Sequence, residues 1–281
     1  MEVVKTVAEM RILRKSMQGT VGLVPTMGYL HEGHLELVRR SRVADDNTIV
    51  SIFVNPIQFG PAEDYGKYPR DPEVDLALLK KEGTDAVFMP SATVMYPPEF
   101  STYVQVRKVT DRLEGASRPG HFDGVATVVA KLFNIVQATR SYFGQKDAQQ
   151  VVVVKRMVED LNFDTEIVVV PTVREPDGLA MSSRNVYLNT EERQAALVLY
   201  QSLLLAQQKW LQGVQDTEVI CREMRRLIES EPRAKIDYIS IAAPDTLEEL
   251  KEAHPGAVVS LAVRIGRTRL IDNIILDVAG K

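Results

Sequence analysis

Short apolar runs alternate with segments of helical periodicity as far as residue 171, and this alternation predicts a parallel sheet with crossover helices. The expected strands are nearly continuous apolar runs, as in strands buried on both faces. They cover residues 20–24, 48–54, 85–89, 141–143 and 166–170. The expected helices are 35–46, a helix ending near 80–83, and helices at 125–136 and 148–159. We therefore expect an α/β fold with a Rossmann-like parallel sheet.

The pattern changes after Pro171, where a turn-rich stretch at 174–178 precedes long polar helices. Asn189 and Glu192 have the spacing of a capping box, which predicts the start of a helix that runs to about Trp210. Further expected elements are a helix at 217–230 and strands at 236–241 and 257–263. We therefore expect two domains: a Rossmann-like domain over 1–173 and a smaller C-terminal α+β lid domain over 174–281.

Composition narrows the class of protein. Apolar residues make up 45% and charged residues 26%, which is typical of a folded globular chain. The net charge of −4 does not provide the positive field of a protein that binds nucleic acid or membrane surfaces. Cys221 is the single cysteine, and no apolar run reaches the roughly 18 residues of a membrane span. We expect a cytoplasmic protein with no nucleic-acid or membrane partner.

The segment 25–34, PTMGYLHEGH, lies where the first expected strand gives way to a helix, the edge at which open parallel sheets bind ligands. His31 and His34 are three residues apart, so in a first helical turn they share one face. Gly33 permits close approach of a ligand, and a helix N-terminus offers N–H groups to anions. Two imidazoles there can donate hydrogen bonds to phosphate oxygens. The alternatives are a capped turn without ligand, or a zinc site, for which further ligands are lacking nearby.

Polar residues follow two other expected strands. Asn55 and Gln58 come after the second strand, and their amides offer both donors and acceptors to a hydroxy-acid substrate. Lys146 and Asp147 come after the strand at 141–143, where lysine suits phosphate and aspartate suits ribose hydroxyls or a metal. Taken alone, each is better explained as an ordinary loop residue.

The motifs together resemble a known family. The segment 31–34 is similar to the HIGH-type signature of the nucleotidyltransferase superfamily, and Met181 to Arg184 (MSSR) stands where its mobile KMSKS-type loop belongs. PTMGYLHEGH, SIFVNPIQFG, YPRD, RPGHFDGV, YFGQKDAQQ and MSSRN resemble, in order, the pantoate–beta-alanine ligase family. The resemblance implies ATP-dependent condensation of (R)-pantoate with beta-alanine through a pantoyl-adenylate, giving pantothenate, AMP and pyrophosphate. It also implies a homodimer.

The resemblance further implies residue roles. The catalytic set is His34 as proton donor, His31 at the phosphates, and Lys146, Ser182, Ser183 and Arg184. The ATP-binding set is Met27, Gly28, Tyr29, Leu30, His31, Glu32, Gly33, His34, Gly144, Gln145, Lys146, Asp147, Val173, Met181, Ser182, Ser183 and Arg184. The substrate-binding set is Asn55, Gln58, Tyr68, Arg118 and Gln150. Mg²⁺ is expected with ATP, and Asp75 and Asp147 are its candidate protein ligands.

Further expectations concern residues beside these motifs, and two other functions stay open. Val74 stands beside Asp75 in place of a second carboxylate, and His121, next to Phe122, is expected to be structural. The loop 60–68 is a candidate for excluding water from the labile adenylate. One rival function is a nucleotidylyltransferase that transfers AMP to a phosphorylated acceptor. The other is a nucleotide sensor without catalysis.

Overall fold

The computed structural model describes residues 1–61 and 63–277. The chain forms two compact units, one made of Met1–Gln145 with Val153–Pro171 and the other of Lys146–Val152 with Thr172–Lys281. We describe each unit by itself. No helix of the described residues has the length and apolar character needed to cross a membrane.

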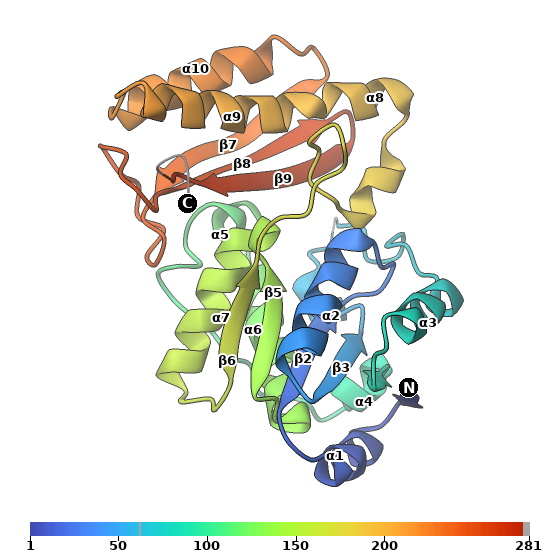
Figure 1. Ribbon diagram of the computed structural model, residues 1–281. Helices are drawn as coiled ribbons and strands as arrows, with labels where there is room; N and C mark the ends of the chain where they lie inside the picture. Colours follow the sequence, from blue (N-terminus) through green and yellow to red (C-terminus); the bar gives the residue numbers. More distant parts are fainter. Residues whose placement is uncertain (62, 278–281) are drawn as a thin grey trace. The chain divides into compact units, whose positions relative to one another are not determined.

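The first unit contains a six-stranded parallel sheet in the order β1-β4-β3-β2-β5-β6. Its strands are β1 (Glu2–Val4), β2 (Val21–Thr26), β3 (Asn47–Ile52), β4 (Ala86–Phe88), β5 (Arg140–Gly144) and β6 (Glu166–Val170) (Figure 1). The two central strands β2 and β3 are almost entirely buried, which explains their continuous apolar runs. The predicted Rossmann-like α/β fold is confirmed.

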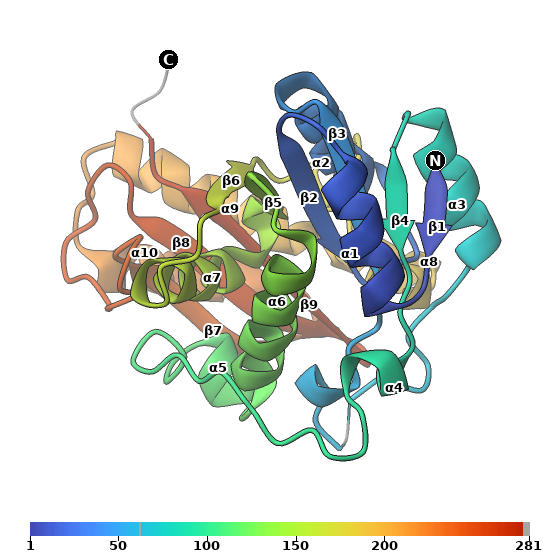
Figure 2. The ribbon, with the colours of Figure 1, turned by 90° about the horizontal axis from the view of Figure 1, so that it is seen from below.

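Helices connect these strands and cover the sheet. They are α1 (Val7–Ser16), α2 (Glu32–Ala44), α3 (Pro72–Lys81), α4 (Ala92–Met95), α5 (Glu114–Ser117) and α6 (His121–Val136). A further helix, α7 (Ala148–Asp160), begins in the second unit and continues in the first. Residues of α2 and α3 share one hydrophobic cluster with the strands, whereas α1 packs beside α6 (Figure 2). The cluster around Val24, Val50 and Val87 anchors the strand ends that precede the site.

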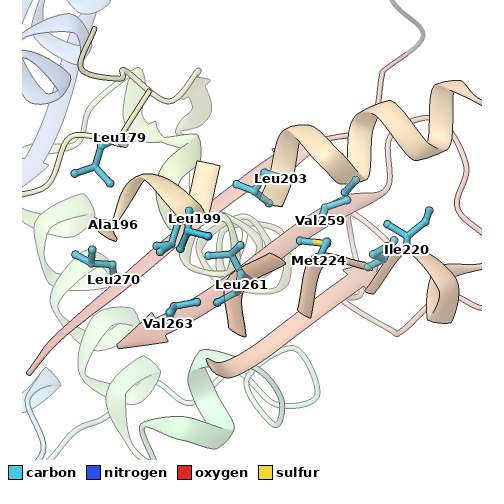
Figure 3. Close-up of a cluster of buried hydrophobic side chains, with 14 of the residues drawn as sticks. Leu179, Ala196, Leu199, Leu203, Ile220, Met224, Val259, Leu261, Val263 and Leu270 are labelled. Carbon is cyan, nitrogen blue, oxygen red and sulfur yellow. The ribbon is translucent and has the colours of Figure 1, made fainter. Parts of the chain in front are cut away.

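The second unit is an antiparallel sheet covered by helices. The strands β7 (Ala234–Ala242), β8 (Val258–Ile265) and β9 (Thr268–Ile275) pair in sequence order, and the helices are α8 (Thr190–Ala195), α9 (Leu197–Leu211) and α10 (Thr217–Glu229). Helix α9 packs on β8 and β9, and α10 packs on α9 and β7. Leu199, Leu203, Met224 and Leu261 lie in the hydrophobic core between helices and strands (Figure 3).

Several boundaries differ from the prediction. The capping box at Asn189 and Glu192 is confirmed, but the single helix expected up to Trp210 is two helices, α8 and α9, which meet at Ala196. The helix expected from residue 35 begins at Glu32, because His31 caps it. The strands β1 and β9 and the helices α1, α4 and α5 were not predicted by the pattern.

Candidate active site

The loop 27–31 connects β2 to α2 and holds an unusual backbone conformation. Gly28 has φ of +80° and Tyr29 has φ of +53°, both in the left-handed region. The Thr26 hydroxyl ties the loop to the sheet, since it donates to the Ser51 carbonyl at 2.8 Å and accepts from the Gly28 amide at 3.2 Å. The loop is therefore held in one defined path at the carboxyl end of β2.

Asp75, in the first turn of α3, fixes the same loop from the other side. Its carboxylate oxygens accept hydrogen bonds from the backbone amides of Tyr29 at 2.8 Å and Leu30 at 2.7 Å. The residue is only 2% exposed. Burial raises the pKa of Asp75 above its ordinary value, although the two amide bonds oppose that shift. Because both oxygens serve the loop, we propose a loop-positioning role for Asp75 in place of magnesium binding.

The two histidines of the motif cap helix α2 reciprocally. His31 Nδ1 accepts from the Gly33 amide at 3.2 Å, and His34 Nδ1 accepts from the His31 amide at 3.3 Å. Their ring centroids are 4.0 Å apart. Because each Nδ1 is an acceptor, a neutral ring carries its proton on Nε2. The pair therefore places two imidazole rings close together at the start of a helix, a position that favours an anionic ligand.

A third group of predicted residues forms a buried chain of amides. Asn55, 1% exposed, donates from Nδ2 to Gln58 Oε1 and to the Gly124 carbonyl, each at 3.0 Å. Gln58 in turn donates from Nε2 to the Met27 sulfur at 3.1 Å. Three predicted site residues, Met27, Asn55 and Gln58, are thus in direct hydrogen-bond contact beside the histidine loop.

Arg118 already forms an ion pair with Glu63. An external anion would have to compete with that carboxylate. The Arg118 guanidinium donates from Nε and Nη2 to the two Glu63 oxygens, both at 2.7 Å. Its Nη1 lies 3.0 Å from His121 Nε2, and His121 Nδ1 lies 2.9 Å from the Gln58 carbonyl oxygen. That carbonyl can only accept, so His121 carries its proton on Nδ1 and accepts from Arg118.

The ionisation of this network follows from its surroundings. Burial, with a further contribution from the Arg118 charge, lowers the pKa of His121 to about 4. Burial alone would raise the pKa of Glu63, but the hydrogen bonds and charge of Arg118 outweigh it, and the net shift is downward. His121 therefore links the Glu63–Arg118 ion pair to the Gln58 backbone as a neutral bridge.

Two other predicted residues of the first unit differ in exposure. Tyr68 is 6% exposed and packs edge-on against Phe59, with ring centroids 6.0 Å apart. Gly144 ends β5, and a Cβ built on it would meet no atom within 4 Å. Tyr68 is thus a packed residue, whereas Gly144 borders open space.

Glu32, a predicted ATP-binding residue in the first turn of α2, forms an ion pair with Arg39 at the surface.

In the second unit, the backbone around Lys146 is held by the last strand. The Asn273 side-chain amide, on β9, donates to the Lys146 carbonyl at 2.8 Å, and Asn273 is 3% exposed. The Lys146 ammonium lies 3.6 Å from the Asp147 carboxylate. Gln150, in the first turn of α7, is half-buried.

A buried ion pair supports the MSSR loop. Arg174 donates to both oxygens of Asp272, at 2.6 and 2.9 Å, and its guanidinium lies 3.9 Å from the Tyr200 ring centre. The Met181 amide donates to the Val173 carbonyl at 3.0 Å. The loop then continues into a 3-10 helix, Ser183–Tyr187, which Ser182 caps by accepting from the Arg184 amide at 3.3 Å. Ser183 is buried, and Ser182 and Arg184 are half-buried.

The described residues offer little for a protein-bound metal. Within 1–61 and 63–277, no group of three or more His, Cys, Asp or Glu side chains could hold a metal ion. This argues against the zinc alternative. With Asp75 engaged by the loop, Asp147 remains as a candidate carboxylate for a magnesium ion held mainly by phosphates.

Sequence reasoning missed several residues that position the site. Glu63, Tyr96 and Asn273 contact predicted residues directly, and Asp272 pairs with Arg174. His121, which is expected to be structural, contacts the Gln58 backbone. His121 lies within the quoted motif RPGHFDGV, and Glu63 stands just after SIFVNPIQFG, which is a weak signal. Tyr96, Asp272 and Asn273 lie outside the motifs.

Comparison with known proteins identifies the family. The family model for pantoate-beta-alanine ligase matches residues 2–275. A pantothenate synthetase of Roseiflexus sp. (strain RS-1) is 57% identical over 99% of this chain and 100% of its own length. The crystal structure of pantothenate synthetase from Thermus thermophilus is similar with a TM-score of 0.95, 50% identity and coverage of 99% of this chain and 100% of that one.

A further solved structure carries ligands. The pantoate-beta-alanine ligase from Francisella tularensis, complexed with beta-gamma ATP and beta-alanine, has a TM-score of 0.82 and 34% identity over 98% of this chain and 97% of that one. Full-length similarity at this level, together with the paired histidines at the β2–α2 junction, leaves one assignment. The chain belongs to the pantoate–beta-alanine ligase family.

Proposed function

We propose that this protein joins (R)-pantoate to beta-alanine with the consumption of ATP, forming pantothenate, AMP and pyrophosphate by way of a pantoyl-adenylate. The observation that carries the proposal is the reciprocal cap of His31 and His34, which holds two imidazole rings side by side at one helix start. Membership of the family, and the complex of the Francisella protein with beta-gamma ATP and beta-alanine, support the same reaction.

In the first step, a pantoate carboxylate oxygen attacks the α-phosphorus of ATP and pyrophosphate leaves. Negative charge on the phosphate oxygens rises at the transition state, so donors fixed in advance lower the barrier. We assign this role to His31 and His34, with His34 as proton donor. Asp75 keeps the preceding loop in place. For Lys146 and the donors Ser182, Ser183 and Arg184, the family resemblance supports a role at the triphosphate.

In the second step, the beta-alanine amine attacks the carbonyl carbon of the mixed anhydride and AMP leaves. No bond to the enzyme forms. Gln58 is proposed to bind pantoate and beta-alanine, and Asn55 is proposed to contribute to the pantoate site by holding the Gln58 amide in place. Gln150 is proposed as a further pantoate ligand. Arg118 would exchange its Glu63 contact for a substrate carboxylate or for pyrophosphate.

Three finer assignments belong to the same proposal. Mg²⁺ would accompany ATP and neutralise phosphate charge, with Asp147 as the candidate carboxylate. The active form would be a homodimer, and the compartment would be the cytoplasm. These assignments rest on the resemblance to the family.

The test is product analysis with purified protein, ATP, Mg²⁺ and (R)-pantoate, with and without beta-alanine. Pantothenate and AMP are expected in equal amounts only when both substrates are present. The variant His34→Ala should lose turnover by about 10² or more while it retains ATP binding. Transfer of AMP to a phosphorylated acceptor, or ATP binding without any turnover, would instead favour one of the two rival functions.

A further inference from the structure

Tyr96, the residue that follows α4, reaches the buried amide chain although it lies outside every family motif quoted above. Its hydroxyl oxygen is 2.7 Å from Asn55 Oδ1. The Tyr96 ring packs edge-on against Phe100, with centroids 5.0 Å apart, and lies 6.1 Å from the Phe53 ring. The ring is thus held by other aromatic side chains, independently of its hydroxyl.

The orientation of the Asn55 amide is determined by its neighbours. Its Nδ2 is 3.0 Å from the carbonyl oxygen of Gly124, and a backbone carbonyl can only accept a hydrogen bond. The atom that faces Tyr96 is therefore the oxygen Oδ1, and the Tyr96 hydroxyl must be the donor. Burial raises the pKa of Tyr96, so the phenol keeps the proton that it donates.

The orientation of the Asn55 amide determines that of Gln58. The second hydrogen of Asn55 Nδ2 points to Gln58 Oε1 at 3.0 Å, so the Gln58 oxygen is an acceptor inside the protein. Gln58 must then present its Nε2–H groups on the other side, where the Met27 sulfur lies at 3.1 Å. A thioether is a weak acceptor, so a carboxylate or hydroxyl oxygen of a ligand can replace it.

We propose that Tyr96 is a positioning residue that holds the Asn55 amide in the orientation set by the Gly124 carbonyl, so that Gln58 offers a hydrogen-bond donor to an acceptor oxygen of the hydroxy-acid substrate. This inference rests on the proposed function, because the hydroxy acid is (R)-pantoate. At the contact with Gln58, the substrate atom is therefore recognised by a hydrogen-bond donor alone. A substrate analogue with an ammonium group in place of that oxygen would meet an N–H group and be rejected.

Removal of the hydroxyl would leave Asn55 Oδ1 buried without its donor. The Asn55 side chain is then expected to adopt other rotamers and to loosen its hold on Gln58. The variant Tyr96→Phe should raise the KM for pantoate about tenfold, with a smaller change in kcat and an unchanged KM for ATP. Tyr103→Phe is the matched control, because Tyr103 also packs on Phe100 but is 59% exposed.

The outcomes separate the two proposals. If the wild-type protein makes pantothenate and Tyr96→Phe matches Tyr103→Phe in pantoate KM, the positioning role is overturned and the proposed function stands. An equal rise in the KM values for pantoate and ATP would also overturn it, because that result indicates a general structural defect. If the wild-type protein does not use pantoate, both proposals fail.

A second pair of variants tests whether Gln58 presents a hydrogen-bond donor to pantoate. This test does not depend on whether Tyr96→Phe folds. Gln58→Glu keeps an oxygen toward Asn55 but replaces the Nε2 donor by a second oxygen, whereas Gln58→Met removes both polar atoms. We expect pantoate binding, measured by calorimetry, to be weaker in Gln58→Glu than in Gln58→Met. Pantoate binding by Gln58→Glu as tight as that of the wild type would overturn the assignment of a donor to this position.

Discussion

The carboxylate of Asp75 accepts a 2.7 Å hydrogen bond from the backbone amide of Leu30, 45 residues earlier in the chain. Together with the bond from Tyr29, it ties the start of α3 to the loop that precedes the histidine pair. Asp75, which the sequence suggests as a metal ligand, therefore organises the loop that precedes the proposed phosphate donors His31 and His34.

This relationship predicts the effect of Asp75→Asn. An asparagine amide has one acceptor oxygen, so one of the two loop amides would lose its bond and face an N–H group. We expect a loss of about 1–3 kcal/mol in the free energy of unfolding and a rise in the KM for ATP. The concentration of Mg²⁺ that gives half-maximal rate should stay unchanged, and Glu73→Gln, an exposed change in the same helical turn, should have no effect. A loss confined to Mg²⁺ affinity would restore the metal assignment.

Gly144→Ala tests the ATP site without disturbing the fold. A Cβ at this position meets no protein atom within 4 Å, and Gly144 is not among the glycines with positive φ. The melting temperature should therefore stay within a degree or two, a shift of less than about 0.5 kcal/mol. If the nucleotide passes close to this strand end, the added methyl group raises the KM for ATP several-fold. An unchanged KM would remove Gly144 from the ATP-binding set.

Gly124→Ala, unlike Gly144→Ala, should destabilise the fold and raise the KM for pantoate. Alanine normally favours a helix by about 1 kcal/mol over glycine. Here, however, the new Cβ would lie 2.5 Å from the Ile57 carbonyl oxygen and 2.6 Å from Gln58 Cα, both backbone atoms. The helix α6 and the Gln58 segment would have to separate. Denaturant unfolding is expected to show a loss of about 1–3 kcal/mol, and pantoate KM should rise. Retained stability would contradict the close approach.

The lowered pKa of His121 predicts acid sensitivity. In the unfolded chain the imidazole takes up a proton near pH 6.5, whereas in the folded protein it does so only near pH 4. Between these values the unfolded state binds more protons, so stability falls as the pH decreases from 6.5 to 4, by up to about 3 kcal/mol. Above pH 7 the effect is absent.

His121→Gln provides the comparison, because its amide can donate to the Gln58 carbonyl and accept from Arg118 without titrating. Unfolding free energies measured between pH 4 and pH 7 should decline more steeply in the wild type than in this variant. Parallel curves for the two proteins would show that His121 does not contribute to the decline.

Asn273→Ala examines how the second unit positions Lys146. The variant removes the donor to the Lys146 carbonyl, and it leaves the neighbouring Arg174–Asp272 pair intact. We expect the KM for ATP to rise by roughly tenfold, equivalent to about 1.4 kcal/mol, with pantoate KM nearly unchanged. Lys251→Ala, an exposed change in the same unit, serves as the control. Equal effects on both substrates would indicate a general loss of structure.

The sequence by itself determined the parallel sheet and the histidine pair. Strands such as 48–54 are recognisable because burial on both faces demands continuous apolar residues, and that demand is local. The capping box at Asn189 is equally local, since its partners are three residues apart. The PTMGYLHEGH motif placed His31 and His34 at a strand-to-helix junction, and the structure agrees.

Only the tertiary structure decided which polar side chains support that site. Strand β9 escaped prediction because the buried Asp272 and Asn273 interrupt its apolar pattern, and their partners, Arg174 and Lys146, are about a hundred residues away. Asp75 and Tyr96 likewise meet their partners 41 to 46 residues along the chain. Local periodicity records which face of an element is buried. It contains no information on which distant donor meets which acceptor, because packing of the whole chain sets that pairing.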